Sequence, residues 1–278
     1  MDLRVYRFAL LACGFAAVFP PAHAQQVDAA ALVRRAMQHR LESDKTHLPL
    51  RYQLHKVDAS HGVSHVTTKE IIETKDGDVA RLIAVDDKPL SPEGERAELD
   101  RLNELAEHPE EQAHRHRAEE KDAARVSRLM ALLPDAFVFQ IEAIEACPSG
   151  KCYRLSFRPK PDWTPPDLEA DLFRGIAGEA WIDQARERLT KIAGNFIADV
   201  DFGLGVLGKL NKGGSVLLEQ TGIGNDDWEL TSLELHVNGK ALLVKTISVQ
   251  LAEQTSHFSR VDPNLTYRQA ILLLKSAP

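Results

Sequence analysis

The residues best suited to chemistry in this 278-residue sequence are a glycine-rich run, a set of histidines and two closely spaced cysteines. The run at 203–208 reads Gly-Leu-Gly-Val-Leu-Gly and matches the G-x-G-x-x-G pattern of dinucleotide sites. That pattern needs a strand before it and a helix after it. Here Lys209–Gly214 follow and lead into another predicted strand, so we expect no nucleotide cofactor.

The eleven histidines and the serines are the residues that could hold a metal or act as a nucleophile. His114 and His116 lie two residues apart in a helical stretch, where their side chains point in different directions. No set of histidines, carboxylates or cysteines has a recognisable metal-ligand spacing, so no metal is expected. Ser149 precedes a glycine but lies in the turn between the two cysteines. The sequence therefore predicts no catalytic residues, no cofactor and no enzyme.

The segment Cys147–Cys152 predicts a disulfide. Pro148 and Gly150 indicate a turn, strand-like sequence flanks both sides, and a hairpin would bring the two Cα atoms to disulfide distance. A metal site would need two further ligands nearby, and four intervening residues do not fit the usual redox spacing. We therefore expect a structural disulfide between Cys147 and Cys152.

Residues 1–24 have the features of a signal peptide, which are a basic start, an apolar run and a small-x-small cleavage site: Arg4 and Arg7, Phe8–Phe19, and Ala22-His23-Ala24. We expect cleavage after Ala24 and a periplasmic location, where disulfides form. A rival interpretation is a lipoprotein box at Leu10–Gly14 with lipid on Cys13. Apolar sequence continues well past Cys13, which favours the cleaved signal peptide.

The charge of the chain limits its partners. The net charge is -7, and removal of the signal segment, with one aspartate and two arginines, changes it to -8. An acidic domain does not attract nucleic acid or anionic lipid. No later apolar run is long enough to cross a bilayer, so we expect a soluble mature form without a transmembrane segment.

Periodicity and turn signals predict the elements. The expected helices cover 27–46, 91–107 and 109–133, with a helical turn at 168–176. The expected strands are 50–57, 63–74, 79–85, 137–146, 153–158, 179–183, 188–202, 215–222, 228–238 and 242–258. Asp76-Gly77 and Asn238-Gly239 are hairpin signals. One domain would span 25–262, followed by a C-terminal tail at 263–278.

These elements predict an α+β fold, mainly β, in which a long antiparallel sheet curls into a half-barrel with an N-terminal helix. A charged helical insertion at about 88–133 would dock through its ends: Leu99, Leu102 and Leu105, and the stripe Val126–Leu133. The insertion either covers one face of the sheet as a lid or forms a solvated hairpin. The apolar concave face must be covered by helices or by a ligand.

The connection after residue 201 is unusually apolar for a loop. Its apolar residues are Phe202, Leu204, Val206, Leu207 and Leu210. They either fold back on the core or form a mobile lip for an apolar ligand or a membrane.

Two adjacent predicted strands carry a family resemblance. Gly178-Glu179-Ala180-Trp181-Ile182-Asp183 and Arg188-Leu189-Thr190-Lys191-Ile192 resemble the G-x-x-W-I-D and L-x-K-I pair of the periplasmic lipoprotein-carrier superfamily, the LolA/LolB-like proteins of outer-membrane lipoprotein sorting. The runs 201–205 and 245–248 are similar to those of uncharacterised bacterial members. The resemblance implies a half-barrel around helices with a cavity for acyl chains. The insertion and the cysteine turn are departures from the authentic carriers.

The first functional hypothesis is a periplasmic binder of an apolar ligand, most simply the acyl chains of a lipid or lipoprotein. Its lining would come from one face of the strands: Trp181, Leu189, Ile192, Phe196, Leu233, Leu235, Val237, Ile247 and Val249. The alternative is an envelope sensor or protein–protein interaction module, with the acidic helical insertion as the contact surface for an envelope protein partner.

Overall fold

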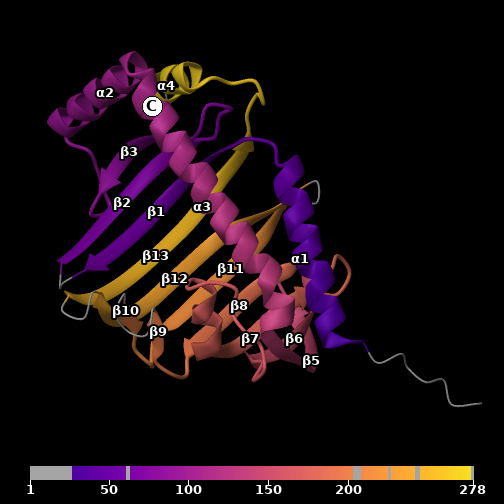
Figure 1. The fold of residues 1–278 in the computed structure, drawn as a ribbon. Helices are drawn as coiled ribbons and strands as arrows, with labels where there is room; N and C mark the ends of the chain where they lie inside the picture. The colour runs from indigo at the N-terminus through magenta and orange to yellow at the C-terminus, as the bar shows by residue number, and fades with distance from the viewer. Residues whose placement is uncertain (1–26, 61–62, 203–207, 225–226, 242–244, 277–278) are drawn as a thin grey trace, which may run out of the picture.

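One antiparallel sheet organises the molecule. The computed structural model describes residues 27–60, 63–202, 208–224, 227–241 and 245–276, so the expected signal peptide and Cys13 lie outside the described residues. Thirteen strands of this part form the sheet, which curves without closing into a barrel (Figure 1). The predicted fold class, a long curved antiparallel sheet with an N-terminal helix and a helical insertion, is confirmed.

The helices are α1 Ala29–Thr46, α2 Pro92–Glu107, α3 Pro109–Ala136, the 3-10 helix η1 Ala170–Gly175, and α4 Tyr267–Ser276. The strands are β1 Leu50–Ser60, β2 Val63–Ile72, β3 Val79–Val85, β4 Lys88–Pro89, β5 Phe137–Cys147, β6 Gly150–Pro159, β7 Ile176–Asp183, β8 Leu189–Phe196, β9 Val200–Phe202, β10 Gly208–Leu210, β11 Ser215–Gly224, β12 Asp227–Ala241 and β13 Lys245–Arg260. The sheet order is β4-β3-β2-β1-β13-β12-β11-β8-β7-β6-β5, and the short pair β9–β10 joins it through β12.

Local capping residues fix where the helices begin. The Asp28 carboxylate accepts the backbone N–H groups of two residues in the first turn of α1, at 2.9 and 3.3 Å. Ser91 caps α2 in the same way, and Pro92 follows at a position where the missing N–H costs nothing. Among the helices of the described residues, none is both long and apolar enough to cross a membrane.

The main core lies between the sheet and two long helices. α1 and α3 run side by side over the concave face, across the end formed by β5–β8 and β11 (Figure 1). Four residues of α1 are buried there: Leu32, Val33, Ala36 and Met37. From α3, Leu129, Met130 and Leu133 pack against the same core, whereas Val126 is 52% exposed. The C-terminal half of the insertion therefore covers the sheet.

A second core lies at the β2–β3 end and includes the C-terminal residues. α4 buries an apolar stripe, Tyr267, Ala270, Ile271 and Leu274, against α2 and the strands. The Arg81 guanidinium donates a hydrogen bond to the Leu274 carbonyl. Residues 263–278, predicted to be a C-terminal tail of uncertain order, instead contain the docked helix α4. The stripe has helical spacing, so its apolar side chains are buried only when the segment folds and docks.

Two turn signals have different outcomes. The Asp76-Gly77 turn joins β2 to β3 as predicted, and Gly77 has the positive φ of 97° that favours glycine. The prediction of a hairpin turn at Asn238-Gly239 is wrong, because both residues lie within β12 and pair with residues of β13. A Cβ on Gly239 would lie 2.2 Å from the Lys209 carbonyl oxygen, so glycine there allows β10 to pair with β12. The expected strand 188–202 is divided into β8 and β9.

The predicted disulfide is present. Cys147 ends β5, Cys152 lies in β6, and their Cα atoms are 5.8 Å apart across the hairpin turn. The Cys152 side chain is fully buried beside Thr190 of β8. The disulfide therefore fixes one end of the sheet near the β7–β8 hairpin.

Candidate ligand-binding site

An unfilled cavity of about 190 Å³ lies within the main core. It lies between α1, α3, η1 and the concave face of β5–β8 and β11, opens partly to the surface, and all its lining side chains are apolar. They are Val33, Met37, Leu133, Phe137, Phe139, Phe157, Leu172, Phe173, Ile176, Ala180, Ile182, Leu189, Ile192, Val216 and Leu218. An apolar cavity of this size can take up an apolar guest.

The strand register directs one row of side chains into this cavity. Ala180 of β7 lies opposite Ile192 of β8, which lies opposite Leu218 of β11. Residues that face each other on neighbouring strands share a face of the sheet, so this row points inward together. The β7 member of this row is a small alanine, which contributes a single methyl group to the lining. The short side chain of Ala180 leaves part of the space that the cavity occupies.

Aromatic rings form the wall nearest the β5 edge. The Phe137 ring lies 5.1 Å from that of Phe157, 5.4 Å from that of Phe173 and 6.1 Å from that of Phe139, all in edge-on arrangements. Such ring pairs are favoured beyond their buried area. They give the cavity a rigid wall between the sheet and η1.

The structure places most of the predicted lining on the concave face, but few of those residues reach the cavity. Leu189 and Ile192 line it directly. Five others share this face and belong to the core around it or to its strand pairs: Phe196, Leu233, Leu235, Val237 and Val249. The side chain of Ile247 lies outside the described residues.

Trp181 lies on the opposite face of the sheet, contrary to the sequence prediction. Its neighbours Ala180 and Ile182 point into the cavity, and successive side chains of a strand alternate between faces. The indole Nε1–H donates to Glu145 at 2.7 Å, and the Lys191 ammonium lies 5.4 Å from the ring centroid. Trp181 therefore cannot line the concave site.

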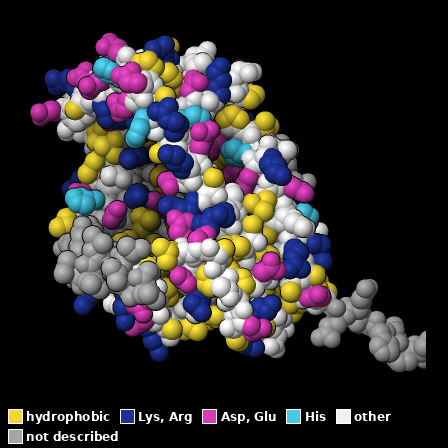
Figure 2. Space-filling model, in the orientation of Figure 1, with side chains coloured by type: hydrophobic (Ala, Val, Ile, Leu, Met, Phe, Trp, Pro, Cys, Tyr) yellow, Lys and Arg dark blue, Asp and Glu magenta, His cyan; other side chains and the backbone are white. Residues whose placement is uncertain are grey.

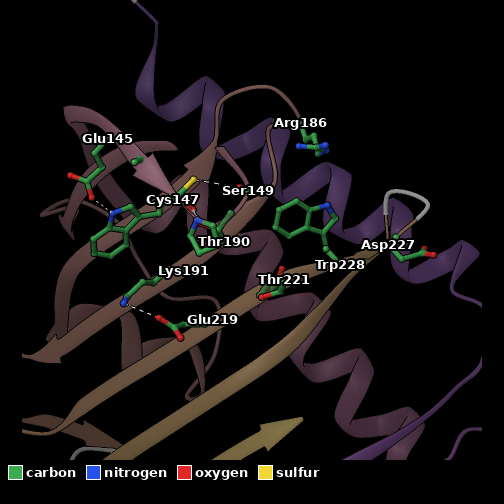
Figure 3. Close-up of a pocket in the computed structure, with 16 residues that line it drawn as sticks. Glu145, Cys147, Ser149, Arg186, Thr190, Lys191, Glu219, Thr221, Asp227 and Trp228 are labelled. Carbon is green, nitrogen blue, oxygen red and sulfur yellow. Dashed lines mark hydrogen bonds and ion pairs between the residues drawn. The ribbon is translucent and has the colours of Figure 1, made fainter. Parts of the chain in front are cut away.

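Trp181 instead lines a polar pocket of about 710 Å³ on the outer face, beside the disulfide turn (Figure 3). Lys191 and Glu219 point toward each other across β8 and β11, with 2.8 Å between nitrogen and oxygen. The hydrogen bond from Trp181 lowers the pKa of Glu145, which keeps that carboxyl ionised. Trp228 is almost buried at the other end of the pocket. The other charged lining residues have ion-pair partners outside the pocket: Glu145 with Arg154, Arg186 with Asp183, and Asp227 with Arg260.

The apolar connection after β9 is described only at its ends. Phe202 and Leu210 pack against the main core, which agrees with folding back. The other proposed lip residues, Leu204, Val206 and Leu207, lie outside the described residues. The lip hypothesis stays a prediction.

Beyond β12 the concave face becomes charged. Lys56 of β1 and Glu253 of β13 form an ion pair at 3.0 Å, and their register places them on the same face as Leu233 and Leu235. Figure 2 shows a hollow beside the middle of α3, in the area of β1, β2 and β13, with charged side chains around it. The apolar part of the concave face therefore ends near β13.

A cluster of ionisable groups lies where α3 meets the β2–β3 turn. Hydrogen bonding to Glu229 and Glu73 raises the pKa of His47 to about 10. Burial, with Glu73 and Glu119 nearby, raises the pKa of Asp78 to about 7. In the part of the chain that the structure describes, no group of three or more His, Cys, Asp or Glu side chains is placed to hold a metal ion. The cluster connects α3 to the sheet.

Several cavity residues were missed by the sequence analysis. The alternation Phe137-x-Phe139 and Leu155-x-Phe157 was visible in the predicted hairpin and marks the inward face. Leu172 and Phe173 lie in the short helix η1, and no periodic pattern identifies a single helical turn as a cavity wall. Their position depends on the tertiary fold.

Comparison with known proteins finds likeness at the level of structure. No protein-family model matches the sequence, and no curated protein matches it.

A DUF1329 family protein from Desulfovibrio piger is 11% identical over 86% of this chain and 96% of its own, with a TM-score of 0.32. A domain named as an outer membrane lipoprotein-sorting protein, from Vibrio parahaemolyticus, is 9% identical over 87% of this chain and 99% of its own, with a TM-score of 0.34. A LolA superfamily protein from Nitrosomonas europaea is 10% identical over 85% and 94%, with a TM-score of 0.30. TM-scores this low do not establish a common fold, so function rests on the geometry of the site itself.

Proposed function

We propose that this protein binds the alkyl chains of a lipid or lipoprotein in the concave cavity and carries them through the periplasm. The observation that supports the proposal is an unfilled, wholly apolar cavity between α1, α3, η1 and the sheet. An exported protein with this site can shield an acyl chain from water between two membranes. Export itself is the prediction made from residues 1–24.

The size of the cavity limits how much of a chain it holds. An apolar cavity of ~150 Å³ accommodates benzene, so a cavity of about 190 Å³ holds roughly seven carbon atoms. Transfer of seven methylene groups from water contributes about 6 kcal/mol, at ~0.8 kcal/mol each. Association costs at least ~4 kcal/mol, so a short chain alone binds weakly. A physiological ligand must therefore offer further contacts outside the cavity.

The test is a series of saturated fatty acids of increasing length, titrated into the processed chain by isothermal calorimetry below their micelle-forming concentrations. The affinity is expected to rise about fourfold per added carbon, which corresponds to ~0.8 kcal/mol per CH₂, until the cavity is full. The slope should then fall, because further carbons lie in a more exposed groove.

A constant slope over the whole series would indicate adsorption to an open surface and would count against the cavity. The absence of heat and of competition with a fluorescent fatty acid at all lengths would overturn the proposal. Native mass spectrometry after mild extraction adds an independent measurement, in which co-purified lipid appears as a defined mass increment.

A further inference from the structure

The two edges of the sheet are protected to very different degrees. At one edge β4 has only two residues, Lys88 and Pro89, and the chain leaves directly into α2. Lysine, proline and short length are the usual protection against pairing with another strand. At the other edge β5 has eleven residues, no lysine and no proline, and exposed Val138 and Ile144. Glu142, Glu145 and a bulge protect its second half, so the template for an added strand is the uncharged first part, Phe137–Ile141.

The register of β5 shows which of its backbone groups face the free edge. The Lys160 N–H donates to the Ala136 carbonyl, so that pair is hydrogen-bonded. Hydrogen-bonded and non-bonded pairs alternate along an antiparallel ladder. The next pair, Phe137 and Pro159, is then non-bonded, which agrees with the missing N–H of proline. By the same alternation, Phe137, Phe139 and Ile141 direct their N–H and C=O groups away from β6.

A groove of about 1010 Å³ runs along this part of β5, between the strand and the start of α1. Phe137 and Phe139 line both this groove and the apolar cavity. The regular part of the edge ends at Ile141, where a bulge follows. Five residues at ~3.4 Å each give room for a short extended peptide.

We propose that β5 is the docking strand for the polypeptide part of an acylated ligand, whose first residues add a strand along Phe137–Ile141. The inference rests on the proposed function, because the attached acyl chain is the one that enters the cavity. A residue opposite Phe139 on the added strand would have its side chain on the same face as Phe139. That face is the concave one, so an acyl chain attached there points directly into the cavity.

An acylated polypeptide bound along β5 also explains how a small cavity can contribute to tight binding. The cavity holds only part of one chain, and backbone hydrogen bonds to β5 add contacts that do not depend on the peptide sequence. A carrier for many different acylated polypeptides needs this kind of recognition. The exposed alternate side chains Val138 and Gln140 lie on the outer face and leave the sequence of the added strand largely free.

The test compares four probes on the processed full-length chain by fluorescence anisotropy competition. They are dodecanamide, a hexapeptide of alternating threonine and valine whose third residue is a lysine acylated with a dodecanoyl group on Nζ, and two versions of this lipopeptide N-methylated at alternate amides. The unmodified lipopeptide should bind at least about tenfold more tightly than dodecanamide. One N-methylated version should lose this gain, and the other should keep it, because only one set of amides faces β5.

A benzophenone group on the peptide should crosslink to residues 137–141, as mapped by mass spectrometry. The inference is overturned if both N-methylated lipopeptides bind alike, or if the crosslinks map to the β4 edge or the outer pocket. It is also overturned if the free protein is a dimer paired through β5 that does not dissociate with lipopeptide. Binding of dodecanamide without any gain for the lipopeptide rejects the docking strand alone, whereas no binding of dodecanamide rejects the cavity.

Discussion

Replacing Ala180 by leucine tests whether the cavity is the binding site. Ala180 lies at the centre of the inward row of β7, and its side chain lines the cavity. The substitution adds three carbon atoms to a space that holds roughly seven. The fatty acid then loses contacts equivalent to about three methylene groups, or ~2.4 kcal/mol, which is about 50-fold in affinity for dodecanoate.

The assay is the calorimetric length series, and the matched control is Ala193→Leu. Ala193 lies on the adjacent strand but faces outward, since its partners Glu179 and Leu217 alternate with the inward row. Ala193→Leu should leave the affinity within about twofold of the original. Ala180→Leu should also move the break in the length dependence to a chain about three carbons shorter. Circular dichroism melting curves establish that both variants are folded.

A substitution that enlarges the cavity, instead of filling it, makes the test more stringent. Ile192→Ala removes three carbons from the wall of the cavity and should move the break to longer chains by about three carbons. It should lower the free energy of unfolding by about 2 kcal/mol, at the low end for an isoleucine that is only partly buried. Equal affinities for Ala180→Leu and the original protein, or equal losses in Ala180→Leu and Ala193→Leu, would refute the reasoning.

Three further predictions concern stability. Replacing both Cys147 and Cys152 by serine should lower the free energy of unfolding in urea by about 2 kcal/mol, from the loop entropy of a short crosslink, and reductant should then have no further effect. Burial raises the pKa of Asp78 to about 7, so the folded state loses stability as the pH rises from about 4 through 7. Asp78→Asn should therefore raise the melting temperature at pH 8 but not at pH 4. An equal shift at both pH values would contradict this explanation. Leu274→Ala should cost about 3 kcal/mol, whereas Leu272→Ala, in the same helix but 65% exposed, should cost less than about 0.5 kcal/mol in the same urea titration.

Local signals explain the parts of the fold that the sequence predicts well. Ser91 and Pro92 mark the start of α2, and Pro109 the start of α3, because caps and first-turn prolines act within a few residues. The β5–β6 hairpin and its disulfide follow from alternating side chains on both sides of a Pro-Ser-Gly turn. These features need no information about the rest of the chain.

The site was only partly predictable because it depends on contacts between distant segments. The prediction that Trp181 shares the inward face with Leu189 and Ile192 is wrong, because the register with β6 and β8 directs Ala180 inward instead. Asn238-Gly239 has the local chemistry of a hairpin turn, yet the close approach of β10 gives that glycine another role. In both cases tertiary pairing overrides a local preference.

Leaving the cavity unfilled has a cost that can be measured. At ~24 cal/mol per Å³, a closed void of about 190 Å³ would cost the folded state about 4 to 5 kcal/mol relative to a filled core, and the partial opening of this cavity lowers that cost. That is a large fraction of the 5 to 15 kcal/mol by which proteins are usually stable, and a larger side chain in place of Ala180 would recover part of it. If the space serves a ligand, stability and binding must respond to Ala180→Leu in opposite directions.

The ligand-free Ala180→Leu variant should therefore melt at the same temperature as the original protein or higher. The original protein should gain melting temperature with dodecanoate in proportion to RT ln(1 + [L]/Kd), and the variant should gain much less. Differential scanning calorimetry with and without dodecanoate separates these two effects. A variant that keeps the full ligand-induced shift would mean that the alkyl chain binds elsewhere, and a variant that melts lower would mean that the space does not accept a larger side chain.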